Sequence, residues 1–160
     1  MKYLFDANVF IRSKNEMPPE LWPTFWIRIV DLIKTGCIYT SIKVKEEIDR
    51  GNDELAQWMK DNAPDSFYYP VDAMVLGKYA ELQNWAYNTA QFTSDALQEF
   101  ASVADAYLVA TAVAKGMMIV TYEKSSPNSK RRVKIPDACM AMKVDFCDLN
   151  GVFRELGVTI

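Results

Sequence analysis

The sequence has 160 residues, 50% of them hydrophobic and 24% charged, and this balance predicts a single globular domain over residues 1–160 with a substantial core. Histidine is absent, which excludes catalytic triads, imidazole bases and every zinc site that needs a histidine ligand. The net charge of −3 excludes a strongly basic, non-specific nucleic-acid coat but is compatible with a local basic patch.

Short apolar runs alternate with longer helical patterns along the chain, which is typical of βαβ units around a parallel sheet. We expect strands at residues 3–5, 37–40, 67–69, 117–121 and 144–147. Helices are expected at residues 19–34, 42–50, 54–62, 73–88, 95–115 and 151–156. Gly36, Gly51 and Gly116 stand where helices should end, because glycine adopts the left-handed cap conformation without strain. The pattern therefore predicts an α/β fold.

The spacing of the cysteines and the lengths of the apolar runs indicate the cellular compartment of the protein. Cys37, Cys139 and Cys147 match neither a disulfide framework nor a four-ligand metal site. The first residues do not have the form of a signal peptide, and no apolar run approaches the roughly 20 residues of a membrane span. We therefore expect a cytoplasmic protein.

Two acids follow the first two predicted strands. Asp6 comes directly after the first strand, so its side chain would lie at the carboxyl edge of the sheet, where open α/β folds place their sites. The alternative is an N-cap of the short helix that follows. Glu47 lies beside the apolar face of its predicted helix, whereas Glu46 points toward solvent. The alternative is a charged surface helix whose acids pair with neighbouring lysines and Arg50.

Asp105 is the most informative acid, because it shares a helix face with the apolar residues Leu108, Val109, Ala112 and Val113. A carboxylate in that position needs a partner. One structural partner is available locally, since the segment from Ser102 to Asp105 has the form of a capping box, which would place Asp105 in the first helical turn. Capping and cation binding are compatible roles for it.

Two further acids lie near the fourth strand and after it. Glu123 shares one side of the strand end with Thr121, and the alternative is an exposed loop acid. Asp137 follows Pro136 and resembles an N-cap, so we favour a structural role for it. Carboxylates that converge repel one another unless a hard cation balances them, and oxygen ligands suit Mg²⁺ or Mn²⁺. The acids therefore predict a metal site, which can activate water and stabilise a phosphodiester transition state.

The segments that carry these acids resemble the PIN domain family of metal-dependent ribonucleases, which includes the VapC-type toxins of bacterial toxin–antitoxin pairs. Residues 3–10 resemble the family's opening strand, residues 41–51 its second block with Glu47 in register, and residues 105–121 its third. The fourth block normally reads Thr, any residue, then Asp or Asn, and here it reads Thr121-Tyr122-Glu123. Residues 134–139 look closest to a little-characterised PIN-like subgroup.

The resemblance implies a three-layer α/β/α fold with a central parallel sheet. It implies a Mg²⁺- or Mn²⁺-dependent endoribonuclease that hydrolyses RNA phosphodiester bonds through a metal-activated water, as the toxin of a toxin–antitoxin pair. Asp6, Glu47 and Asp105 would hold the principal ion, and Glu123 would help to hold a second. Residues that would orient water or phosphate are Asn8, Thr121 and Ser125. Residues that would bind flanking phosphates are Lys130, Arg131, Arg132 and Lys134, in the only concentrated basic patch. The alternative for that patch is a solvated flexible loop.

Two other functions fit part of the sequence. One is a non-catalytic PIN-like RNA- or protein-binding module, in which Glu123 reflects a decayed site. The other is a flavodoxin-like receiver, which is weakened by a missing lysine-bearing strand. An exposed part of the helix near Trp22 and Trp26 would serve an antitoxin partner or a homodimer, although core packing is the default for these aromatic residues.

Overall fold

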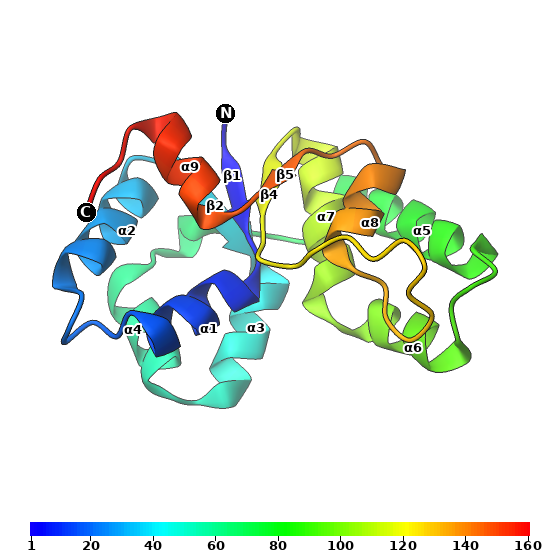
Figure 1. The fold of residues 1–160 in the computed structure, drawn as a ribbon, viewed down its shortest axis with the longest axis horizontal. Helices are drawn as coiled ribbons and strands as arrows, with labels where there is room; N and C mark the ends of the chain where they lie inside the picture. Colours follow the sequence, from blue (N-terminus) through cyan, green and yellow to red (C-terminus); the bar gives the residue numbers. More distant parts are fainter.

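The structure, a computed structural model, describes all 160 residues and has one five-stranded sheet in the order β3-β2-β1-β4-β5 (Figure 1). The strands are β1 (Tyr3–Phe5), β2 (Ile38–Ser41), β3 (Tyr68–Tyr69), β4 (Met118–Val120) and β5 (Phe146–Cys147). The helices are α1 (Ala7–Glu16), α2 (Pro23–Lys34), α3 (Ile42–Gly51), α4 (Glu54–Asn62), α5 (Ala73–Asn88), α6 (Ser94–Ser102), α7 (Ala104–Lys115), α8 (Ile135–Ala141) and α9 (Leu149–Leu156), with a 3₁₀ turn at Asp65–Phe67.

All strand pairs are parallel, and β1 lies at the centre between β2 and β4. Every residue of β1 is buried, because helices cover both faces of a parallel sheet. In Figure 1 the helices α1, α2, α4 and α9 lie to the left of the sheet and α5 to α8 lie to its right. The three-layer α/β/α prediction is therefore confirmed. None of the helices combines the length and apolar character required to span a bilayer.

The parallel arrangement brings the carboxyl ends of β1, β2 and β4 to one edge of the sheet. Two hydrogen bonds fix these ends to one another: the Thr40 hydroxyl donates to the carbonyl of Phe5 at 2.6 Å, and the amide of Asp6 donates to the carbonyl of Val120 at 3.0 Å. Whatever follows these strands is therefore held in a defined place at the edge.

The prediction of a single helix over residues 95–115 is wrong, because the helix is interrupted at Val103. Val103 has an extended backbone (φ −91°, ψ 165°), and the Ser102 hydroxyl donates back to the carbonyl of Glu99 at 3.0 Å. The periodic apolar pattern continues across the break, which is why the sequence pattern did not reveal it. The break places Asp105 in the first turn of α7.

Other boundaries also differ from the prediction. The helix expected from residue 19 begins only at Pro23, since proline favours the first helical turn. Helices α1 and α8 were not predicted, although the N-cap alternative for Asp6 implies a short helix where α1 begins. Gly36 and Gly116 have left-handed backbones as predicted, but Asn52, not Gly51, takes this conformation after α3 (φ 44°). Asparagine tolerates that region better than other residues with a side chain.

Candidate active site

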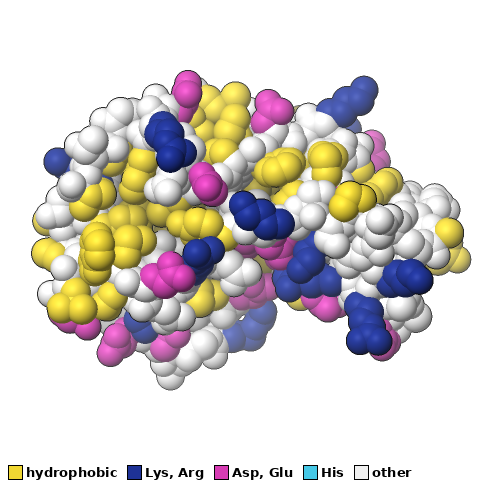
Figure 2. All heavy atoms as spheres, in the orientation of Figure 1, with side chains coloured by type: hydrophobic (Ala, Val, Ile, Leu, Met, Phe, Trp, Pro, Cys, Tyr) yellow, Lys and Arg dark blue, Asp and Glu magenta, His cyan; other side chains and the backbone are white.

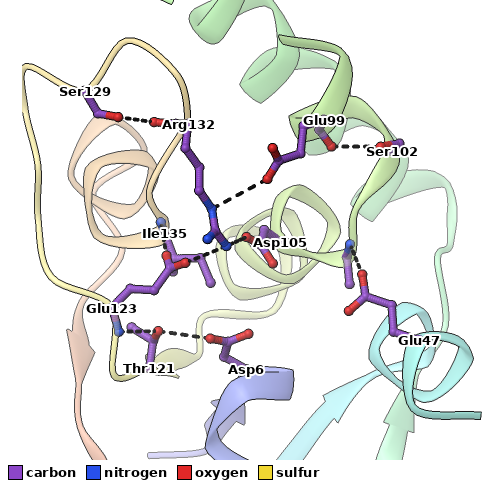
Figure 3. Close-up of polar contacts among 11 residues, drawn as sticks. Asp6, Glu47, Glu99, Ser102, Asp105, Thr121, Glu123, Ser129, Arg132 and Ile135 are labelled. Carbon is purple, nitrogen blue, oxygen red and sulfur yellow. Dashed lines mark hydrogen bonds and ion pairs between the residues drawn. The ribbon is translucent and has the colours of Figure 1, made fainter. Parts of the chain in front are cut away.

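The acids singled out in the sequence meet at the carboxyl edge of the sheet. Asp6 follows β1, Glu123 follows β4, Glu47 lies on α3 after β2, and Asp105 lies in the first turn of α7. Figure 3 shows these side chains around one space, with Arg132 reaching into it from the loop that precedes α8. In Figure 2, acidic and basic side chains gather near the middle of the face, where the two halves of the molecule meet.

Asp6 is almost completely buried, with 2% of its surface exposed. One carboxylate oxygen, Oδ2, accepts a hydrogen bond from the Thr121 hydroxyl at 3.1 Å. Asp6 occupies the N-cap position of α1, as the N-cap alternative predicted, and the amides of Ala7 and Asn8 lower its pKa, although no capping hydrogen bond of standard geometry is present. Burial, and then the charge of Glu123, raise the pKa of Asp6 to about 6.

Asp105 is the carboxylate on which the other acids act most strongly. Burial raises its pKa to about 7, and the charges of Asp6, Glu123 and Glu47 add to that effect, while Arg132 opposes it. Only 15% of the side chain is exposed. A carboxylate with this environment is a buried negative charge that its neighbours do not fully balance.

Glu47 reaches the start of α7. Its Oε1 accepts a hydrogen bond from the amide of Ala104 at 2.9 Å, at the first residue of that helix. The predicted capping box is therefore wrong: Val103 is the N-cap without a side-chain cap, and Glu47 from α3 satisfies the helix terminus instead of Ser102. Glu46 is half exposed and pairs with Lys43 at 3.4 Å, away from the site.

Glu123 uses both of its carboxylate oxygens. Oε2 accepts from the amide of Ile135 at 2.7 Å, and Oε1 forms an ion pair with Nη2 of Arg132 at 3.0 Å, although its geometry is not that of a hydrogen bond. The side chain is 11% exposed, so the exposed-acid alternative is wrong. Thr121 supports the same turn, because its hydroxyl accepts from the amide of Glu123 at 3.1 Å.

Arg132 is the cation among the acids. Besides Glu123, its guanidinium lies 3.7 Å from Oδ2 of Asp105 and 3.6 Å from Oε1 of Glu99 (Figure 3). The sequence pattern predicts only a phosphate-binding role for Arg132 and gives no signal for Glu99. No spacing along the chain could have shown these contacts, since they join α6, α7 and two separate loops.

The backbone of the basic segment accepts hydrogen bonds from neighbouring residues. Gln91 donates from Nε2 to the carbonyls of Pro127 and Ser129 at 2.7 and 2.8 Å, and the amide of Thr93 donates to the carbonyl of Lys130 at 2.9 Å. The Ser129 hydroxyl donates to the carbonyl of Arg132 at 2.7 Å. The segment thus has a defined course along α6 and toward the acids.

Asp137 has a structural role, but it is not the predicted N-cap. Lys134 precedes α8 at the N-cap position, and Asp137 accepts hydrogen bonds from the Ser125 hydroxyl at 2.7 Å and the Ser126 amide at 2.8 Å. The Ser125 hydroxyl is therefore used to anchor the loop. Asn8, in the first turn of α1, is exposed and makes no side-chain hydrogen bond. Lys130 and Arg131 are exposed and form no ion pair.

The residues at this edge fit a hard divalent cation in donor type and charge. All the donors are carboxylate or hydroxyl oxygens, and burial together with the charges of neighbouring acids raises the pKa of Asp6 to about 6 and that of Asp105 to about 7. As the side chains stand, however, no group of three or more acids lies close enough together to hold a metal ion. The cation that the acids contact in the structure is Arg132.

Comparison with known proteins places the chain in a family and relates its fold to solved structures. A family model described as "Domain of unknown function (DUF4411)" matches residues 3–160. No curated protein matches the sequence. A chain from VapBC2 of Rickettsia felis, crystallised with a DNA fragment from its promoter, is similar with a TM-score of 0.56 and 13% identity over 92% of this chain and 98% of that one. A chain from FitAcB of Neisseria gonorrhoeae is similar with a TM-score of 0.53 and 18% identity over 90% of this chain and 95% of that one. At these identities the likeness concerns the fold, and it confirms the PIN-like fold of the VapC type.

Proposed function

The chain belongs to the DUF4411 family and has a VapC-like PIN fold, and from this premise we propose that it is a Mg²⁺- or Mn²⁺-dependent endoribonuclease. The observation that supports the proposal most is the environment of Asp105, whose pKa is raised to about 7 by burial and by three neighbouring acids. Buried acids that repel one another destabilise a protein, so their presence at one sheet edge is best explained by a function that needs them.

In this proposal Asp6, Glu47 and Asp105 hold the divalent ion. A bound ion would supply Lewis-acid charge for activating water and for stabilising the phosphodiester transition state. Thr121 orients Asp6 through its hydroxyl, and Glu47 stays fixed by its bond to the amide of Ala104, which leaves its second oxygen free. The chain has no histidine to move a proton, so in this proposal the bound ion would supply the activation of water.

The substrate contacts come from exposed cations and polar groups near the same edge. Lys130 and Arg131 are exposed, unpaired and fixed by the backbone bonds of their loop, which suits them to bind phosphates that flank the cleaved bond. Asn8 is free to donate to a phosphate oxygen at the end of β1. RNA is proposed as the substrate on the strength of the resemblance to PIN ribonucleases.

We further propose that the protein is the toxin of a toxin–antitoxin pair, because both similar structures carry the names of two-component complexes. A candidate surface for a protein partner lies over α2 and α4. A hollow of about 390 Å³ there is lined by Trp26 and Trp58 and by charged residues that include Lys14 and Glu54, and Leu21, Trp22 and Ile27 are 46% to 72% exposed. Figure 2 shows hydrophobic side chains over the half of the face where Figure 1 places α2 and α4. A homodimer is the alternative occupant, and sedimentation of the purified chain distinguishes the two.

The test of the proposed activity is cleavage of a labelled single-stranded RNA by the purified chain. We expect cleavage with Mn²⁺ or Mg²⁺, none with EDTA, and none by Asp105→Asn with either ion. Glu46→Gln is the matched control, since it removes an equal charge from the neighbouring residue on α3, which is half exposed and points away from the site, and it should cleave like the wild type. Cleavage that persists in EDTA, or in Asp105→Asn, would refute the proposal.

A non-catalytic PIN-like binding module is the second candidate. The observation that favours it is Arg132, which already neutralises part of the acid cluster and lies where the acids would otherwise converge. Such a module would bind RNA or a protein partner without binding Mn²⁺. Titration calorimetry with Mn²⁺, combined with the cleavage assay, separates the two: neither binding nor cleavage would favour the module.

A further inference from the structure

The guanidinium of Arg132 is more accessible than the two buried acids that it contacts. Its side chain is 41% exposed, against 15% for Asp105 and 11% for Glu123 (Figure 3). The backbone around it is held, because the Ser129 hydroxyl donates to the Arg132 carbonyl and Glu123 accepts from the amide of Ile135. A polyanion that approaches this edge of the sheet from solvent therefore meets a cation before it meets these acids.

The guanidinium has donors that no group of the chain satisfies. Its nitrogens lie 3.0 Å from Glu123, 3.7 Å from Asp105 and 3.6 Å from Glu99, but none of these carboxylates accepts a hydrogen bond of good geometry from it. Nε is buried and has no hydrogen-bond partner. A buried donor without an acceptor is unfavourable, and a guanidinium carries five N–H donors in a planar fork. The arrangement therefore favours a ligand that brings acceptor oxygens.

A phosphate group fits this donor pattern. Its non-bridging oxygens accept two parallel N–H bonds from an arginine fork. The carboxylates of the site alone would repel a phosphate, so a cation between them and solvent is needed to admit it. Lys130 and Arg131 directly precede Arg132 and are exposed, so a strand whose phosphate binds Arg132 has further phosphates near these two cations. This favours a polynucleotide over a free phosphate ion.

We propose that Arg132 binds the phosphate whose bond is cleaved, and not a flanking phosphate as the sequence pattern predicts. Its Nε–H and Nη–H groups donate to the two non-bridging oxygens, while Lys130 and Arg131 bind flanking phosphates. This inference rests on the proposed function, because it identifies the phosphate of the RNA that lies at the acids. The ion pair with Glu123 is then an orienting contact, which holds the fork beside the acids before RNA binds.

The first test observes the Nε–H group of Arg132 directly by nuclear magnetic resonance, in EDTA. The full chain is labelled with ¹⁵N-arginine, the Arg132 signal is assigned from Arg132→Lys, and a single-stranded RNA is titrated in. We expect the Arg132 Nε–H signal to shift and its exchange with water to slow as RNA binds, because an unpaired donor gains an acceptor. Arg28, whose Nε already donates to the carbonyl of Thr159, provides the reference signal and should not change.

The second test separates Arg132 from its neighbour by the kinetics of cleavage with Mn²⁺. Arg132→Ala should lower kcat about 100-fold, as expected for the loss of a donor to the reacting group. The matched variant Arg131→Ala removes the same charge one residue away and should raise KM without lowering kcat. Arg132→Lys keeps the charge but not the fork, so it should also lower kcat, and it serves if the alanine variant does not fold.

Two results would overturn the inference alone while the wild type still cleaves RNA. One is RNA binding without a change in the Arg132 Nε–H signal. The other is a rise in KM alone for Arg132→Ala, which would make Arg132 another flanking contact. Absence of RNA binding would overturn the inference together with the proposed function. A wild type that binds RNA with the expected change at Arg132 but does not cleave it would refute the proposed activity and support the phosphate contact.

Discussion

Asp105→Asn should stabilise the protein when no metal is present, because it removes a carboxylate whose ionised form is unfavourable in the folded protein. The pKa of Asp105 is raised from 3.8 to about 7, so its stabilising contribution is complete below about pH 4 and is lost as the pH rises through 7. At about 1.4 kcal/mol for each pH unit, this difference in pKa lowers the free energy of unfolding by about 4 kcal/mol at pH 8, and by less than half of that at pH 5, where the folded carboxyl is protonated and only the unfolded chain is ionised. The asparagine variant keeps the shape and avoids this loss.

The assay is urea unfolding in EDTA at both pH values, with Glu46→Gln as the control for removing a charge from an exposed position. We expect Asp105→Asn to be more stable than the wild type at both values, by the larger margin at pH 8, and Glu46→Gln to match the wild type. Saturating Mn²⁺ should stabilise the wild type, by about 2.7 kcal/mol at 100 times the dissociation constant, and should not stabilise Asp105→Asn. An equal or lower stability of Asp105→Asn at pH 8 would refute the account of mutually repelling acids.

Three further changes test separate contacts. Glu47→Gln should abolish RNA cleavage without lowering the metal-free stability, since its amide oxygen still accepts from Ala104 and one repelling charge is removed. Glu47→Ala removes the same charge and also the acceptor, so it should be about 1 kcal/mol less stable than Glu47→Gln in urea unfolding, and equal stability of the two would contradict the capping role. Combined replacement of Lys130 and Arg131 by alanine should weaken RNA binding and reduce the slope of log K against log salt by about 1.4, as expected for two phosphate contacts on a single strand, and an unchanged slope would remove these residues from the interface. Asp137→Asn weakens an anchor of the basic loop, so limited proteolysis within the loop should accelerate, and unchanged protection would show that the other clamps suffice.

Much of the fold could be predicted from the sequence, because the strands and most helices follow from hydrophobic period. The helices at Glu54–Asn62 and Ala73–Asn88 agree with the prediction at both ends, where Asp53 and Asp72 provide local N-caps. The break at Val103 was missed, since the apolar pattern runs through it and the helix start is capped from a distance by Glu47. A cap supplied by a residue next to the helix can be predicted from the sequence, whereas a cap supplied by a residue distant in the chain, such as Glu47, cannot.

The acids of the site were predictable for a related reason. Asp6 and Glu123 follow strands, Asp105 lies in the first turn of α7 and Glu47 lies within the helix that follows β2, so the parallel strands bring all four toward one edge. The arrangement of Arg132 and Glu99 was not predictable, because their contacts join α6, α7 and the loop before α8. Composition showed a basic patch near Arg132, but only the folded chain separates Arg132, which faces the acids, from Arg131, which faces solvent.

The most direct test of the account is the anomalous diffraction of crystals soaked in Mn²⁺. We predict an anomalous peak among Asp6, Glu47 and Asp105 in each chain. The absence of a peak at these acids would contradict the proposal that they form a metal centre, as would a peak only at a distant surface.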